Sequence, residues 1–582
     1  MSLEDAVRPS HPSRYHDEDT SPTTQRELRG WYSYAIAAEV FAVVGVGLFL
    51  PVLLEQLPRE RGVLFSDSSK PCVDPPGSGD AGRFRARAGG SDSDDQCIVR
   101  FLGSEVTTTS FAMYTTSAAV LFQAITLICF SSFADYGPYR KKLLLTFAYT
   151  GATVCSLFVF ITSSVYFLAP FLVVIGVTCL GSGFSLLNAF LPLLVSNHPS
   201  HGKSFSSDDS SEYELEGLNR RDSANSAHSF HPDKADKLTE DLERSSKISS
   251  KGVGLGYASA VGFQFFSVGV IIAFDKLGLS KGNPTLPMRV ILFLVGIWWA
   301  LFTIPTLLWL RPRPGPPLPT QPEHSSIFTG LNSPLIFYLS FSVRSFWNTL
   351  RRASRLRQTL IFLAAWFLLS DAVATISGTA ILFARTELHM GTIPLVFLSL
   401  TSIGFSMIGA FLWPRVAAHY ALSPKTVLIA CTVGMEIIPL YGLLGYIPII
   451  KTLGVGGIQK PFEIYPIGVI HGLVMGGISS YARSVYAPLI PEGSEAAFFA
   501  LYAVTDKGSS AVGPALVGWI VNRAGTIRPA FIFLAILVVL PGPLLWWLDV
   551  EKGREEASRL AGERDAVTVG GYARVGEDNR ED

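Results

Sequence analysis

Twelve apolar runs, each long enough to cross a lipid bilayer as a helix, constrain the fold of this chain more than any other feature. A helix needs about 20 residues to span the hydrocarbon core, and lipid offers no partner for a free peptide group, so these runs are predicted to be helices. Charged residues make up only 16% of the chain, against roughly 25% in a typical soluble domain. The sequence therefore predicts an all-α polytopic membrane protein, with spans near residues 31–55, 108–133, 143–164, 166–195, 252–274, 288–310, 358–384, 392–413, 426–447, 465–490, 496–521 and 529–548.

The runs fall into two sets of six, which predicts two six-helix halves. We expect the N-terminal half at 31–310 and the C-terminal half at 358–550, joined by a cytosolic linker at 311–357 that opens on a stiff proline-rich stretch. Residues 1–30 and 551–582 are expected to be cytosolic tails. The first tail is rich in Ser, Thr, Pro and charge, a composition typical of disordered segments.

Two polar loops interrupt the N-terminal half. The loop at 56–107 is rich in Gly, Ser and Asp and contains Cys72 and Cys97, which could pair if the loop faces an oxidising lumen. The loop at 196–251 is acidic and Ser-rich and shows no hydrophobic periodicity. We interpret it as a disordered linker that offers plausible phosphorylation sites.

Basic residues in short connections predict the orientation. They collect at Arg140 to Lys142, after the second span, and again at 351–357, before the seventh. Short loops rich in Lys and Arg stay on the cytosolic side, so with twelve spans both termini are expected there as well. Lys plus Arg and Asp plus Glu both number 47, and this balance argues against nucleic acid as a partner.

The segment 491–518 carries the most informative charges. Its middle is apolar enough for a bilayer, yet Asp506 and Lys507 stand side by side in it. Charges at that depth are costly unless they face a partner or a watery cavity. Tyr502 and Asp506 share one helical face with small residues, so the segment is predicted to be a cavity-lining helix that bends at its glycines. Because neighbouring helical residues point about 100° apart, Asp506 and Lys507 are expected to need separate partners.

Other charged side chains fall inside predicted spans. Glu39 and Asp371 each lie near the middle of the first helix of their half, where they could bind an amine or carry a coupling proton. An interhelical hydrogen bond, or a carboxyl buried in its neutral form, is the alternative. Arg483 could pair with one of these acids, hold a substrate carboxylate, or sit near the cytosolic end and snorkel. His471 shares its helical face and is either a proton relay or an ordinary core histidine.

The sequence SFADYGPYRKK joins the second and third spans. An acid, a glycine turn and a basic cluster at such a junction predict a charge clamp that gates the cytosolic side, formed by Asp135, Gly137 and Arg140. The pattern resembles the loop signature of the major facilitator superfamily, although the corresponding loop of the second half, WPRVAAHYALSPK, is degenerate. The resemblance implies two parallel repeats with substrate bound near the midplane.

Longer stretches resemble one group within that superfamily. LLSDAVATI and GGISSYARSVYAPLIPEGSEAAFFALYAVTDKGSS, together with the Ser-rich loop, are similar to the fungal vacuolar amino-acid effluxers of the autophagy-related group. The resemblance covers about residues 31–550. It implies a vacuole-membrane permease that exports leucine, isoleucine, tyrosine and other amino acids freed by autophagic breakdown. It implies no enzymatic activity and no cofactor; the expected partners are amino-acid substrates, membrane lipid and, as a coupling ion, protons.

The charged residues themselves favour a zwitterionic substrate. An amine needs a carboxylate such as Glu39, and a carboxylate needs a cation such as Arg483 or Lys507. Apolar room is expected from three aromatic residues, Trp366, Tyr114 and Phe184. The alternatives are a facilitator for another small solute and a non-transporting membrane protein that acts in the breakdown of autophagic bodies. The metalloprotease, Walker-loop and serine-hydrolase motifs for which we searched do not occur in the sequence.

Overall fold

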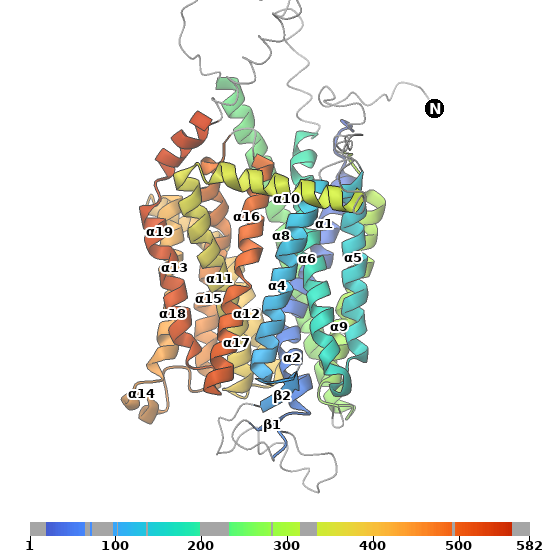
Figure 1. Cartoon of the computed structure of the whole chain (residues 1–582), viewed down its shortest axis with the longest axis vertical. Coiled ribbons are helices and arrows are strands. Elements are labelled where there is room, and N and C mark those ends of the chain that lie inside the picture. The colour runs from blue at the N-terminus through green and yellow to red at the C-terminus, as the bar shows by residue number, and fades with distance from the viewer. Residues whose placement is uncertain are drawn as a thin grey trace, which may run out of the picture.

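The computed structural model describes residues 19–64, 70–72, 97–101, 103–134, 138–197, 232–280, 283–314, 334–491 and 495–560. Long helices stand side by side in one bundle, with a small sheet at one end (Figure 1). The end that carries the sheet is called the sheet end below, and the opposite end, where α1 begins, is called the terminal end.

The first half of the bundle is built around α1, whose first turn is capped by the side chain of Thr24. A π-helical stretch, η1, follows α1 directly and continues into α2, so that residues 25–59 form one unbroken helical span. The helices of this half are α1 (Gln25–Val40), η1 (Phe41–Phe49), α2 (Leu50–Arg59), α4 (Thr108–Ala134), α5 (Tyr139–Leu157), η2 (Phe158–Phe160), η3 (Ser163–Leu168), α6 (Ala169–Ser196), α8 (Pro232–Lys276) and α9 (Leu286–Trp309).

The second half begins after a connecting helix, α10 (Pro334–Ala353), which runs across the terminal end of the bundle (Figure 1). Its helices are α11 (Arg357–Thr386), α12 (Thr392–His419), α13 (Pro424–Leu444), α14 (Pro448–Leu453), η4 (Pro461–Glu463), α15 (Ile464–Tyr486), η5 (Ala487–Leu489), α16 (Glu495–Ser509), α17 (Val512–Ala524), α18 (Ala530–Val539) and α19 (Pro541–Trp547).

Eleven helical stretches among the described residues are long and apolar enough to cross a membrane. This confirms the predicted all-α polytopic fold. The span expected at 496–521 is the exception, because it is two shorter helices, α16 and α17, that meet at a turn of Ser510 and Ala511. A proline has no N–H to donate and its ring clashes with the carbonyl four residues earlier, so Pro514 prevents the helix from passing through Ser510. The predicted bend is therefore a complete break.

Helices extend into several segments that were predicted as tails or linkers. The tail expected at 1–30 is shorter, since α1 already begins at Gln25, and residues 550–560 of the other tail are helical. The linker expected at 196–251 contains the start of α8 at Pro232, where the sequence KADKLTEDLER is rich in good helix formers. The central linker likewise contains α10, which the sequence reading missed.

The loop at 56–107 contains a three-stranded antiparallel sheet of β1 (Val63–Leu64), β2 (Cys97–Phe101) and β3 (Ser104–Thr107). A disulfide joins Cys72 to Cys97, with the two Cα atoms 6.1 Å apart. The sheet packs on the bundle, because Tyr166 Oη donates to the carbonyl oxygen of Arg100 at 2.9 Å and the ring of Phe101 lies edge-on to that of Phe111. The sequence analysis predicted a polar loop here but did not predict this sheet.

The two halves meet through α4 with α16 and α17, and through α8 with α12. Polar contacts join them along these seams. Ser110 Oγ donates to the Gly518 carbonyl at 2.6 Å, and the Thr107 N–H donates to the side chain of Asn522 at 3.0 Å. Gln264 donates to Ser399 Oγ at 2.7 Å in the second seam. Thr107 and Ser110 lie next to the sheet, so the α4–α17 seam holds the halves together at the sheet end.

Candidate functional site

The break between α16 and α17 is the centre of the candidate site. The last turn of a helix leaves carbonyl groups without intrahelical partners, and three hydroxyl groups satisfy one of them here. The carbonyl oxygen of Asp506 accepts hydrogen bonds from Ser370 at 2.9 Å, Ser509 at 3.0 Å and Ser510 at 3.2 Å. Because Ser370 belongs to α11, the end of α16 is tied to the first helix of its half. Sequence reasoning missed Ser370, although it precedes the predicted Asp371.

Asp371 occupies the other side of the break. Its Oδ1 accepts the N–H of Gly513 at 2.9 Å and the hydroxyl of Thr375 at 3.4 Å, and the residue is only 2% exposed. Gly513 is the second residue of α17, so the carboxylate lies at the positive end of that helix dipole. A Cβ atom on Gly513 would lie 1.9 Å from Thr375 Oγ1 and 2.7 Å from Asp371 Oδ1. These short distances explain why this position is a glycine. The structure thus gives Asp371 an interhelical hydrogen bond, one of the two roles left open by the sequence.

Asp506 and Lys507 contact each other directly. Lys507 Nζ lies 2.9 Å from Asp506 Oδ2, and Asp506 Oδ1 also accepts the hydroxyl of Ser370 at 2.7 Å. The expectation that the two residues need separate partners was wrong. Their Cα–Cβ bonds do diverge, but the flexible four-carbon stem of a lysine can bring its ammonium group back to a neighbouring carboxylate.

Charges from both halves converge on this pair. Glu39, on α1 of the first half, lies close enough to Lys507 to interact with it electrostatically. Arg483, on α15 of the second half, interacts in the same way with Lys507 and with Tyr502. Tyr257 on α8 interacts electrostatically with both Glu39 and Arg483. Five predicted residues, Glu39, Arg483, Tyr502, Asp506 and Lys507, are therefore brought together, with Tyr257 as an addition. We call these six residues the charged cluster.

Two members of the charged cluster are exposed, and the other four are half-buried. The side chain of Lys507 is 50% exposed. Arg483 is also exposed, and its guanidinium makes no hydrogen bond or ion pair with any residue that the structure describes. An arginine presents five N–H donors in a planar fork suited to a carboxylate. The cluster therefore contains positively charged hydrogen-bond donors that protein partners do not fully occupy and that remain available to a ligand.

Aromatic rings line one side of the cluster. Tyr502 stacks on Trp366 with ring centroids 5.0 Å apart and on Tyr486 with centroids 5.3 Å apart. Trp366 was predicted to supply apolar room. The other two predicted aromatic residues lie elsewhere in the bundle: Tyr114 packs against Gly518 in the α4–α17 seam, and Phe184 lies edge-on to Tyr34.

The remaining predicted residues lie outside the cluster. Both ring nitrogens of His471 are within hydrogen-bonding distance of serine hydroxyls, Ser377 at 3.0 Å and Ser402 at 2.8 Å, which is the environment of a satisfied core histidine. Arg140, at the start of α5, is buried with its guanidinium 5.6 Å from the centre of the Phe190 ring. Asp135 and Gly137 lie outside the described residues, so the predicted loop clamp stays a prediction.

A two-part bundle of membrane-spanning helices, with charges from both halves gathered at a broken helix, has the fold of the major facilitator type. Solved structures share this fold. A crystal structure of a POT family transporter in complex with 5-aminolevulinic acid superposes with a TM-score of 0.50 at 12% identity, covering 93% of this chain and 99% of the other.

Sequence comparison places the chain more narrowly. Residues 23–558 match the family model described as "Vacuole effluxer Atg22 like". Autophagy-related protein 22-1 of Phaeosphaeria nodorum is 62% identical over 568 residues, covering 97% of each chain. The protein of the same name from Sclerotinia sclerotiorum is 50% identical over 579 residues, covering 96% of this chain and 95% of the other. The chain belongs to the Atg22-like vacuole effluxer family and is a multi-pass transporter of the vacuolar membrane.

Proposed function

We propose that the protein exports amino acids, including leucine, isoleucine and tyrosine, from the vacuole to the cytosol, and that the charged cluster binds them. The observation that carries the proposal is the meeting of Glu39 from one half with Lys507 and Arg483 from the other. A zwitterion bound there would place its amine at the carboxylate and its carboxylate at the guanidinium. Trp366, stacked on Tyr502, would supply an apolar surface for the side chain.

Alternating access around the charged cluster is part of the proposal. A ligand held by groups of both halves is released when one half rocks against the other around the site. The polar contacts across the seam at the sheet end are single hydrogen bonds such as Ser110 to Gly518 and Thr107 to Asn522. Hydroxyl and amide groups of this kind can exchange their partners for water at small net cost, so opening the seam costs mainly the packing of α4 on α17, such as that of Tyr114 on Gly518. Protons remain the proposed coupling ion.

Two observations support an orientation with the sheet end in the vacuolar lumen and both termini in the cytosol. Disulfides persist in oxidising compartments and are rare in the cytosol, and the Cys72–Cys97 bond lies at the sheet end. The basic residues Arg351 and Arg352 end α10 at the opposite end of the bundle (Figure 1), which agrees with the positive-inside rule.

Efflux from vacuole membrane vesicles tests the proposal. Vesicles preloaded with labelled leucine should release it faster when they contain the protein. Hydrogen bonds to charged groups are worth about 1.5–3 kcal/mol, so Glu39→Gln and Arg483→Gln should each slow release about tenfold or more. Glu105→Gln serves as the matched control, because Glu105 is 58% exposed on β3, outside the cluster.

Each other outcome has a definite meaning. Release that the protein does not accelerate would reject leucine as a substrate and favour a facilitator for another solute or a non-transporting role. Release that is accelerated equally by the parent protein and by both cluster variants would keep the export function and reject the site.

A further inference from the structure

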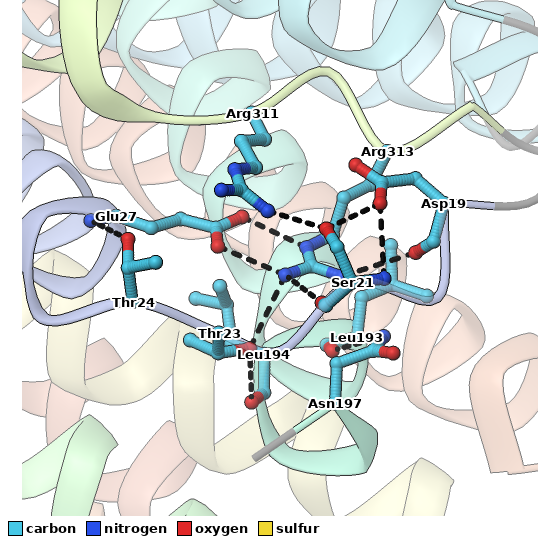
Figure 2. A network of polar contacts seen from close by, with 10 residues as sticks. All are labelled: Asp19, Ser21, Thr23, Thr24, Glu27, Leu193, Leu194, Asn197, Arg311 and Arg313. Atoms are coloured by element: carbon cyan, nitrogen blue, oxygen red, sulfur yellow. Dashed lines mark hydrogen bonds and ion pairs between the residues drawn. The ribbon is translucent and has the colours of Figure 1, made fainter. Parts of the chain in front are cut away.

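The segment before α1 is fastened to the terminal end of the first half by a polar network (Figure 2). Arg313, which follows α9, donates to both oxygens of Glu27 at 2.8 Å and to the carbonyl oxygens of Asp19 and Ser21 at 3.2 Å. Thr23 completes the attachment, since its N–H donates to the Asn197 carbonyl at 2.7 Å. The segment 19–24 thus joins the end of α6 to the start of the connection between the two halves; we call it the N-terminal strap.

Ser21 lies at the point of the strap where charges of opposite sign meet. Its hydroxyl donates to Asp19 Oδ1 and accepts from Arg311 Nη1, and its N–H donates to the same Asp19 oxygen at 3.0 Å (Figure 2). Within the network, Asp19 and Glu27 balance Arg311 and Arg313, so the four charges sum to zero. Burial raises the pKa of Asp19, but the hydrogen bonds from Ser21 and the two arginines outweigh it, so that pKa lies below its usual value and the side chain is ionised at neutral pH.

We propose that Ser21 is a phosphorylation site, and that a phosphate on it detaches the N-terminal strap. A phosphoserine carries about −1.5 to −2 charges at pH 7. Placed on Ser21 Oγ, it would stand beside the ionised Asp19 in a network that is already neutral. Arg311 would attract it, but the added charge exceeds what one arginine neutralises, and Arg313 is engaged by Glu27. Repulsion from Asp19 then favours the detached strap.

The chemistry also requires the strap to open first. Ser21 is half-buried, so a protein kinase reaches it only when residues 19–24 transiently leave the bundle, as weakly held terminal segments do. The serine oxygen then bonds to the γ-phosphorus of ATP, the bond to the bridging oxygen breaks to leave ADP, and the hydroxyl proton passes to the aspartate of the kinase. Pro22 helps Ser21 to adopt an extended backbone, because the residue before a proline prefers that conformation. The added phosphate would then oppose reclosure.

This inference goes beyond the proposed transport function but rests on its orientation, since ATP and kinases act on the cytosolic side. A switch here would act on the start of the connection between the halves. The connection begins after α9, and Arg311 and Arg313 are its first two basic residues. When the strap detaches, the start of the connection therefore loses its polar contacts with the strap.

Amide hydrogen exchange of Thr23 in the full-length protein tests the proposal, because that N–H is bonded to Asn197 only while the strap is attached. Treatment with ATP and a proline-directed kinase should place one phosphate on Ser21, found by mass spectrometry, and should speed exchange at Thr23 about tenfold. Ser21→Glu should do the same in part, and Ser21→Gln, which matches it in size without the charge, should not. Asp19→Asn combined with Ser21→Glu should return exchange to nearly the parent rate.

Two results would overturn the inference. Absence of phosphate on Ser21, both after kinase treatment and in protein purified from fungal cells, would reject the site. Equal acceleration by Ser21→Glu and Ser21→Gln, or no effect of Asp19→Asn on the response, would show that charge does not detach the strap. Neither result bears on leucine export, which the vesicle measurement tests separately.

Discussion

Replacing Arg313 with methionine is expected to destabilise the protein by about 3–5 kcal/mol, the usual cost of removing one partner of a buried ion pair. The side chains of Arg313 and Glu27 are 2% and 0% exposed, and two N–H groups of the guanidinium each meet one carboxylate oxygen at 2.8 Å. Methionine fills a similar volume but leaves the carboxylate of Glu27 buried without its counter-charge. The measurement is the midpoint of thermal unfolding of the detergent-solubilised protein.

The controls separate the charge from the packing. The double variant Glu27→Gln with Arg313→Met removes both charges and should recover most of the lost stability. Arg311→Met should cost less than about 1 kcal/mol, because Arg311 is only partly buried and contacts a neutral hydroxyl. A midpoint for Arg313→Met that equals that of Arg311→Met would contradict the account.

The backbone of Arg313 shows how strongly the network holds this residue. Its φ angle is 41°, in the left-handed region that costs a non-glycine residue of order 1–3 kcal/mol. Such a conformation persists only where the surroundings hold it, and here the guanidinium supplies that hold through Glu27 and the strap carbonyl groups (Figure 2).

Replacing Asp371 with alanine is expected to have the second large effect, through loss of the cap on α17. The N–H of Gly513 would remain buried without its acceptor, and an unsatisfied buried donor costs about 1–3 kcal/mol. Asp371→Asn keeps an oxygen in the same place and should retain most of the stability. Thermal unfolding of the two variants, measured side by side, checks this.

Transport by the asparagine variant separates the two roles of Asp371. If the residue acts through the hydrogen bond to Gly513, Asp371→Asn should export labelled leucine at nearly the parent rate while Asp371→Ala loses both stability and transport. Loss of transport in a fully stable Asp371→Asn protein would instead show that its charge binds substrate or carries a proton, which is the other role that the sequence left open.

Hydrophobic runs predicted the spans because each run must satisfy its own peptide groups in lipid. Where the membrane no longer imposes that rule, the prediction failed, as at α10, at the start of α8 and in the small sheet. The break before α17 was only half foreseen. The glycines of the segment predicted a bend, but the stabilising contact comes from Asp371, 142 residues away in the chain.

The charged cluster was partly predictable for a related reason. Charged residues within apolar runs are rare enough to be recognised singly, which is how Glu39, Arg483 and Asp506 were found. Their grouping depends on how α1, α15 and α16 are placed in space, and so do partners such as Ser370, whose hydroxyl is unremarkable in the sequence. The same holds for Arg313 and Glu27, which lie 286 residues apart.

Calorimetric titration of the purified protein tests whether the charged cluster binds a zwitterion between the halves. Leucine would be compared with 4-methylpentanoate, which lacks the amine, and with 3-methylbutylamine, which lacks the carboxylate. Both analogues should bind at least about tenfold more weakly than leucine. Arg483→Gln should abolish the advantage of leucine over the amine, and Glu105→Gln should leave it unchanged. Equal binding of all three compounds, or a full advantage of leucine in Arg483→Gln, would contradict the proposed zwitterion site.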